Sequence, residues 1–78
     1  MNPDHFNQLN NHEKSEAILN ATFLADRLTD QHYIRLYNLD KFYVEVFFDD
    51  ASHTICGFRA FEHTLFVLPY LTDLKVAV

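Results

Sequence analysis

The sequence predicts an α+β fold: an N-terminal helix packed on an antiparallel β-sheet meander of three strands, or four with an added edge strand, followed by a short C-terminal helix (αβββα). Residues 33–61 are rich in β-branched and aromatic side chains and contain two short polar segments, which is typical of strands joined by tight turns. Upstream, apolar residues recur at spacings of three and four, as on one face of a helix. We expect residues 1–78 to form a single domain, because so short a chain buries only one core.

The composition indicates which class of protein the chain belongs to and which kinds of partner are not expected. With 49% hydrophobic residues, one Gly and two Pro, the chain is expected to fold as a soluble globular domain. It has no apolar run long enough to span a membrane and no signal peptide pattern, so the cytoplasm is the expected compartment. A net charge of -5 opposes a general affinity for nucleic acid or for a membrane surface.

The N-terminal segment is expected to be helical. Asn2 suits a helix cap and Pro3 suits the first helical position, which would bring Phe6 and Leu9 onto the core. A clearer helix is predicted from about Asn11 until the chain reaches residues 29–31. Its core-facing stripe consists of Ala17, Ala21, Leu24 and Leu28, flanked by Ile18 and Ala25.

Two large apolar residues fall outside that stripe. Leu19 and Phe23 lie one helical turn apart on the far side of the predicted helix. They are either an ordinary exposed pair or a contact with a second chain or with the C-terminal segment.

The segment from Phe42 to Phe48 is predicted to be the central strand, and turn lengths set its register. A two-residue turn at positions 39–40 would bury Arg35 beside Val44, so a three-residue turn at 39–41 is preferred. It pairs Ile34 with Val46, Leu36 with Val44, Arg35 with Glu45 and Tyr37 with Tyr43. A second turn with its tip at 51–53 places Val44 beside Ala60, Val46 beside Phe58 and Phe48 beside Cys56.

This register gives the sheet two unlike faces. The first face is plain core and comprises Ile34, Leu36, Phe42, Val44, Val46, Phe48, Cys56, Phe58 and Ala60. The second face is aromatic and comprises Tyr33, Tyr37, Tyr43, Phe47, Ile55 and Phe61, set around a row of Arg35, Glu45 and Arg59. Val44, Val46, Phe58 and Leu24 are therefore predicted to be core.

The aromatic face is the candidate interface or ligand site, formed by Tyr33, Arg35, Tyr37, Tyr43, Glu45, Phe47 and Arg59. Tyrosine and arginine are enriched at the centres of protein interfaces, so we expect a homodimer or a contact with another protein. The alternative is a binding module for a small anionic or aromatic ligand, held by two guanidinium groups among tyrosines.

Other candidate chemistry has a simpler interpretation. The segment Asp49 to His53 has oxygen and nitrogen donors that suit a divalent ion, but aspartate and serine are also common turn residues, and a solvated hairpin tip is preferred. Cys56 is expected to be a small buried hydrophobe. The sequence contains no catalytic or cofactor-binding motif, and its histidines are dispersed.

The C-terminal segment has an ambiguous period. Residues 64–67 are either a fourth, edge strand or an extended crossing. Pro69 suits the start of a helix, which is predicted to reach about Val76.

Overall fold

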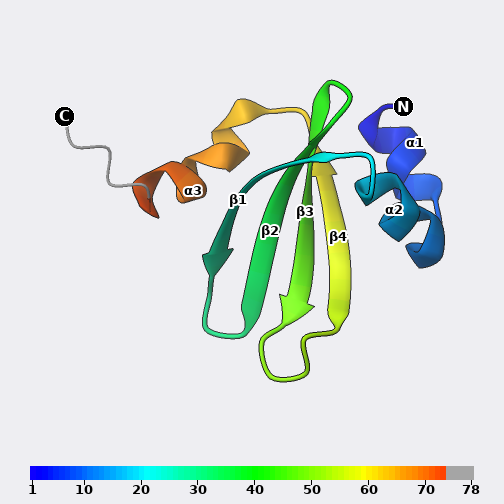
Figure 1. Ribbon diagram of the computed structural model, residues 1–78. Helices are drawn as coiled ribbons and strands as arrows, with labels where there is room; N and C mark the ends of the chain where they lie inside the picture. Colours follow the sequence, from blue (N-terminus) through cyan, green and yellow to red (C-terminus); the bar gives the residue numbers. More distant parts are fainter. Residues whose placement is uncertain (74–78) are drawn as a thin grey trace.

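The computed structural model describes residues 1–73, apart from the side chains of residues 65, 66 and 71–73. In chain order the elements are α1 (Pro3–Gln8), α2 (Asn11–Ile18), β1 (Thr22–Leu28), β2 (His32–Leu39), β3 (Phe42–Asp49), β4 (Ile55–Phe61), the 3₁₀ helix η1 (Thr64–Val67) and α3 (Leu68–Asp73) (Figure 1). The strands form one antiparallel sheet in the order β1-β2-β3-β4. The predicted α+β class is confirmed.

Helices cover both faces of the sheet, but only at one of its ends. Figure 1 shows α1 and α2 on one side and α3 on the other, all beside the end at which β2 turns into β3. At the opposite end, which carries the β1–β2 and β3–β4 connections, no helix of the described chain lies over the sheet. We call this end the open end and define it as residues 28–33 and 48–57.

The first helix forms as its sequence predicts. Asn2 caps it by accepting a hydrogen bond from the backbone N–H of His5, and Pro3 occupies the first helical position. Phe6 is fully buried and its ring makes edge contacts with the rings of Phe42 and Phe58. The predicted placement of Phe6 in the core is confirmed.

The second helix is shorter than predicted, and residues 22–28 form strand β1 in its place. A capping box at Asn10 and Glu13 starts α2. After its end, the backbone N–H groups of residues 19–21 each donate a hydrogen bond to the carbonyl three positions earlier, as in a 3₁₀ turn. The helical spacing beyond this point was misleading, because pairing with β2 satisfies a whole row of backbone groups and outweighs local propensity. Leu24 is consequently 46% exposed, and its prediction as core is wrong.

The predicted register between β2 and β3 is wrong by one residue. The turn has two residues, Asp40 and Lys41, where three were expected. Asp40 adopts φ 54°, a left-handed conformation that aspartate tolerates better than most residues, and this permits the tighter turn. Arg35 consequently pairs with Val46 and not with Glu45.

The two faces therefore differ from the predicted ones, because a one-residue shift moves each side chain of β2 to the other face relative to β3. Ile34 and Leu36, expected beside Val46 and Val44, lie on the opposite face from them. The core under α1 and α2 contains Phe6, Leu39, Phe42, Val44 and Val46. The core under α3 contains Ile34, Leu36, Phe61 and Tyr70.

The register between β3 and β4 agrees with the prediction over most of its length. Val44 pairs with Ala60, and Val46 pairs with Phe58. A register shift after Phe47 then pairs Phe48 with Ile55, so the expected partner Cys56 lies in an irregular part of the strand. Cys56 is exposed, and its prediction as a buried hydrophobe is wrong.

After β4 the chain folds back over the face opposite to α1. Residues 64–67 form η1 and not a strand, so the fourth strand of the sheet is β1. Pro69 is the second residue of α3, where its missing N–H costs no helical hydrogen bond. The part of the predicted helix from residue 74 to Val76 lies outside the described residues. Within residues 1–73, no helix has the length and apolar character needed to cross a membrane.

Candidate functional site

A row of four apolar side chains crosses the open end of the sheet, with one residue from each strand. Leu28 pairs with Tyr33, Tyr33 pairs with Phe48, and Phe48 pairs with Ile55. Directly paired residues share a face of an antiparallel sheet, so the four side chains lie side by side on the face that α1 and α2 cover at its other end. We call Leu28, Tyr33, Phe48 and Ile55 the open row.

The ends of the open row are accessible to solvent. Leu28 is 68% exposed and Ile55 is 45% exposed, while Tyr33 and Phe48 between them are half-buried. The rings of Tyr33 and Phe48 lie 5.9 Å apart between centroids. The hydroxyl of Tyr33 donates a hydrogen bond to Asp26, and this bond raises the pKa of Tyr33 above its ordinary value.

Arg35 extends this surface toward the helices. Its guanidinium group lies 4.4 Å from the ring centroid of Phe23 and 5.5 Å from that of Tyr37, so its charge is placed on aromatic faces. Phe23 is 44% exposed. On this face, β1 and β2 therefore combine exposed aromatic area with the cation of Arg35.

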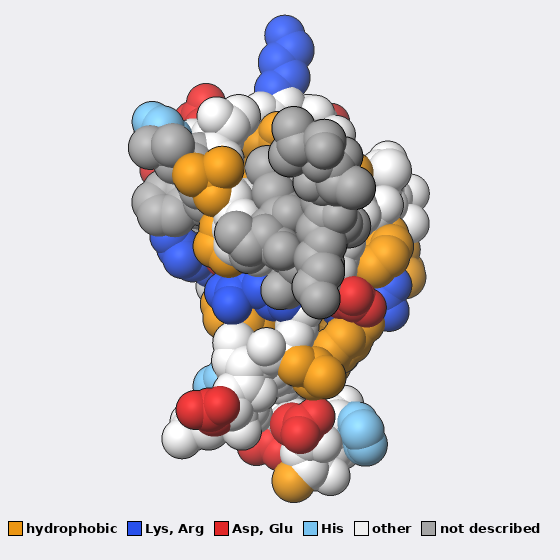
Figure 2. Space-filling model, turned by 90° about the vertical axis from the view of Figure 1, so that its left-hand side faces the viewer, with side chains coloured by type: hydrophobic (Ala, Val, Ile, Leu, Met, Phe, Trp, Pro, Cys, Tyr) orange, Lys and Arg blue, Asp and Glu red, His pale blue; other side chains and the backbone are white. Residues whose placement is uncertain are grey.

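The loops of the open end are acidic. Asp30, Asp49 and Asp50 are its only charged residues apart from histidine, since residues 28–33 and 48–57 contain no lysine or arginine. These three carboxylates line a hollow of about 370 Å³ between the two loops, together with His32. Figure 2 shows acidic side chains at this end of the α3 face and basic side chains across its middle.

Asp49 also organises the β3–β4 turn. Its Oδ1 accepts hydrogen bonds of 2.9 Å from the backbone N–H groups of Ala51 and Ser52. These bonds lower the pKa of Asp49, because they favour the ionised carboxylate. Among the described residues, no group of three or more His, Cys, Asp or Glu is placed to hold a metal ion.

A second polar cluster lies beneath α3. Glu45 is 2% exposed, and its Oε2 accepts a 2.7 Å hydrogen bond from the hydroxyl of Tyr70. Arg27 lies 3.9 Å from Oε2, and Arg59 lies 3.6 Å from Oε1. Two cations and a hydroxyl thus compensate one buried carboxylate, which would be costly to bury alone.

The cluster ties α3 to the sheet. The guanidinium group of Arg27 lies 5.2 Å from the ring centroid of Tyr70, so Tyr70 contacts both an anion and a cation. Burial and the hydrogen bond to Glu45 both raise the pKa of Tyr70, and its hydroxyl stays protonated well beyond neutral pH. These contacts describe a structural tie between helix and sheet.

The structure divides the predicted interface or ligand residues between the two faces. Tyr33, Arg35 and Tyr37 point toward the side of α1 and α2, whereas Tyr43, Glu45, Phe47 and Arg59 point toward α3. Glu45 and Arg59 are brought together as predicted, but Arg27 takes the place expected for Arg35. The combination of Arg35, Glu45 and Arg59 cannot contact one small ligand, because the sheet separates Arg35 from the other two.

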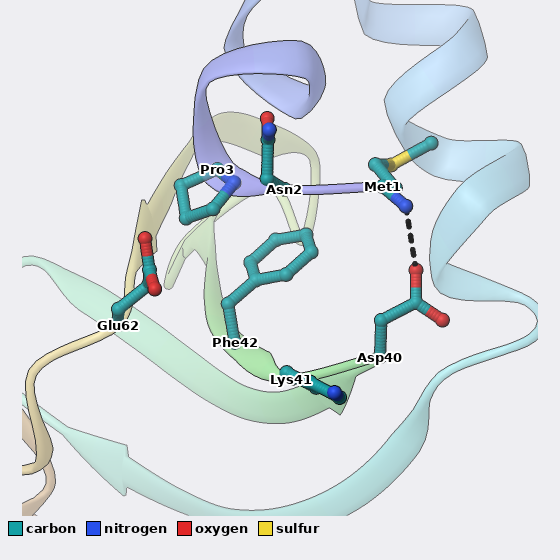
Figure 3. A pocket seen from close by; sticks show the side chains of 7 residues that line it. All are labelled: Met1, Asn2, Pro3, Asp40, Lys41, Phe42 and Glu62. Atoms are coloured by element: carbon teal, nitrogen blue, oxygen red, sulfur yellow. Dashed lines mark ion pairs between the residues drawn. The ribbon is translucent and has the colours of Figure 1, made fainter.

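A larger hollow, of about 660 Å³, lies at the helix-covered end (Figure 3). Phe42 is at its centre, with Glu62 on one side and Asp40 and Lys41 on the other. The amino group of Met1 lies 3.2 Å from Asp40. Opposite charges are spread around this hollow and do not converge on one point, so they define no class of ligand.

Comparison with known proteins finds no matching family model, no similar curated protein and no similar solved structure. Any assignment of function therefore rests on the residues of this chain.

The sequence did not predict where three residues of these clusters would lie. Leu28 and Arg27 belong to β1, which was predicted to be helix, and Tyr70 belongs to the short helix after Pro69. The sequence signal available was the pair Thr22-Phe23, whose β-branched and aromatic side chains favour a strand. No local signal links Tyr70 to Glu45, because 25 positions separate them in the chain.

Proposed function

We propose that this protein is a protein–protein interaction module that docks another protein chain on the open row. The observation that carries the proposal is the continuity of the row: four apolar side chains span every strand of the sheet, and no helix of the described chain covers them. Contiguous exposed apolar surface on a small protein generally marks a contact site.

The neighbours of the open row support this function. Phe23, Tyr37 and Arg35 add aromatic and cationic surface beside it, and tyrosine, phenylalanine and arginine are enriched where interfaces are buried most deeply. The charged side chains, by contrast, give no support to a catalytic role. The buried carboxylate of Glu45 is already engaged by Tyr70 and lies under α3 on the other face. We expect the module to act in the cytoplasm, as the sequence predicts.

Site-specific photo-crosslinking in the cell that makes the protein tests the proposal. A photoreactive phenylalanine analogue is placed at Leu28 or Ile55 and, as a matched control, at Leu68, which is 49% exposed on the other face. We expect one discrete adduct from both open-row positions and none from the control. Equal labelling from all three positions, or no adduct at Leu28 and Ile55, would contradict a docking role for the open row.

Self-association is the second candidate, and the free edge of β1 favours it. β1 is an outer strand of the sheet, and Leu24 on it and Leu19 just before it are 46% and 83% exposed. An exposed apolar edge strand can pair with its copy in a second chain and extend the sheet. Sedimentation equilibrium of wild type and of Leu24→Lys tests this: we expect a dimer that the variant weakens, and a wild type that stays monomeric at tens of micromolar excludes it.

A further inference from the structure

We infer that the partner segment for the open row is a basic amphipathic helix, an inference that rests on the proposed docking function. The open row and the acidic loops beside it define what such a segment must carry. It needs apolar side chains to cover Tyr33 and Phe48, and cations to face Asp30 and Asp50.

The shape of the face favours a helix as the occupant. The same face is covered at its other end by helices, where Phe6 of α1 and Ala17 and Ile18 of α2 pack on the core. A partner helix would continue that layer over the uncovered half of the sheet. The open row crosses four strands, and three spacings of about 4.8 Å make it about 14 Å wide. A helix covers that distance in about nine or ten residues, so apolar anchors at i, i+3, i+7 and i+10 match the row.

The charges favour a basic helix. Asp30 and Asp50 follow Leu28 and Phe48 of the open row by two positions, their loops contain no lysine or arginine, and the whole chain carries a net charge of -5. A neutral or acidic helix would cover the same apolar area but would leave these carboxylates unpaired or repelled.

Two model peptides test the inference. Each has about 18 residues, with leucines at i, i+3, i+7 and i+10, and its polar face carries lysines in one peptide and glutamates in the other. Calorimetric titration at physiological salt is expected to show binding of the lysine peptide, with amide shifts in the nuclear magnetic resonance spectrum concentrated at the open row. The glutamate peptide is expected to bind at least about tenfold more weakly.

Matched variants separate the contribution of charge from that of apolar contact. The double variant Asp30→Asn, Asp50→Asn is expected to weaken binding of the lysine peptide about fivefold. The control Glu16→Gln, Glu62→Gln changes the net charge by the same amount at positions away from the row, and is expected to leave the affinity within about twofold of wild type. Leu28→Ser with Ile55→Ser alters only exposed side chains and is expected to weaken both peptides.

The possible results distinguish this inference from the proposed function. If both peptides bind equally and only Leu28→Ser with Ile55→Ser weakens them, the docking surface stands and the basic partner is wrong. If both pairs of charge variants weaken the lysine peptide equally, its binding is non-specific and the inference fails. An adduct of twice the chain mass in the crosslinking experiment identifies a second copy as the occupant and also overturns the basic helix. Absence of any adduct there removes the docking function itself.

Discussion

The two ends of the α1/α2 face carry similar side chains and differ in what covers them. At the helix-covered end, Val44 and Val46 are 0% and 2% exposed because α1 and α2 pack over them. At the open end, Leu28 and Ile55 remain 68% and 45% exposed although they are equally apolar. Hydrophobic free energy follows the area removed from water, so the first pair stabilises the fold and the second contributes little to it. Apolar residues that do not stabilise the monomer are available for binding.

The largest expected effect is at the helix-covered end. Phe6→Ala removes a fully buried ring that contacts Phe42 and Phe58, and large-to-small substitutions of this kind cost about 3 to 5 kcal/mol. A domain of this size has little more stability than that, so folding should be incomplete. Urea unfolding followed by circular dichroism measures the loss.

The matched control for that substitution is Phe23→Ala on β1. Phe23 is 44% exposed, and its ring contacts Tyr37 and the guanidinium group of Arg35. We expect a cost of about 1 kcal/mol, in the ordinary range for a partly exposed side chain. If Phe23→Ala destabilised the protein as much as Phe6→Ala, the difference between the two regions would disappear.

A smaller effect is expected from the tie between α3 and the sheet. Tyr70→Phe removes the hydroxyl that donates a hydrogen bond to the buried carboxylate of Glu45. Hydrogen bonds to charged groups stabilise proteins by about 1.5 to 3 kcal/mol, and we expect a loss of that order in urea unfolding at neutral pH. A variant as stable as wild type would show that α3 is not held by this contact.

The difference in stability between wild type and Tyr70→Phe is expected to depend on pH. The pKa of Tyr70 is raised in the folded state. The stabilisation by its neutral hydroxyl is therefore fully present below the pKa of the unfolded chain, about 10. It is lost as the pH rises from there toward the pKa of the folded state. The stability advantage of wild type over Tyr70→Phe should therefore narrow above about pH 10. The other tyrosines are common to both proteins and cancel in the difference. A constant advantage up to pH 12 would contradict the assignment.

The smallest effect is expected at the open row. Leu28→Ser with Ile55→Ser changes two side chains that are already largely in water. The free energy of unfolding should change by no more than about 1 kcal/mol in total, as is usual for exposed positions. A loss comparable to that of Phe6→Ala would mean that the open row belongs to the core of the isolated chain.

The sequence was sufficient for features that depend on local chemistry. The cap at Asn2 and Pro3, the core position of Phe6 and the pairing of Val46 with Phe58 all follow from residue types and short-range spacing. The α+β class follows from the same signals. Of the candidate site, the neighbourhood of Glu45 and Arg59 could be predicted, because both lie on strands joined by a recognisable hairpin.

Features that depend on distant parts of the chain could not be predicted in this way. Residues 21–28 have a helical spacing of apolar residues, and only the unpaired edge of β2 makes them a strand. The positive φ of Asp40 shortens one turn by one residue, and this moves Arg35 away from Glu45 and leaves its place to Arg27. A difference of one residue in the length of a turn thus decides which residues share a face.

The accessibility of Cys56 in the isolated chain tests most directly whether the open end is uncovered. Cys56 is the single cysteine, is exposed, and follows Ile55 of the open row directly. We predict that a thiol reagent modifies the folded chain nearly as fast as the urea-unfolded chain, at a rate independent of protein concentration, and that the lysine peptide slows the reaction. A slow reaction in the dilute folded chain, or protection that grows with protein concentration without any peptide, would show that this end is already covered.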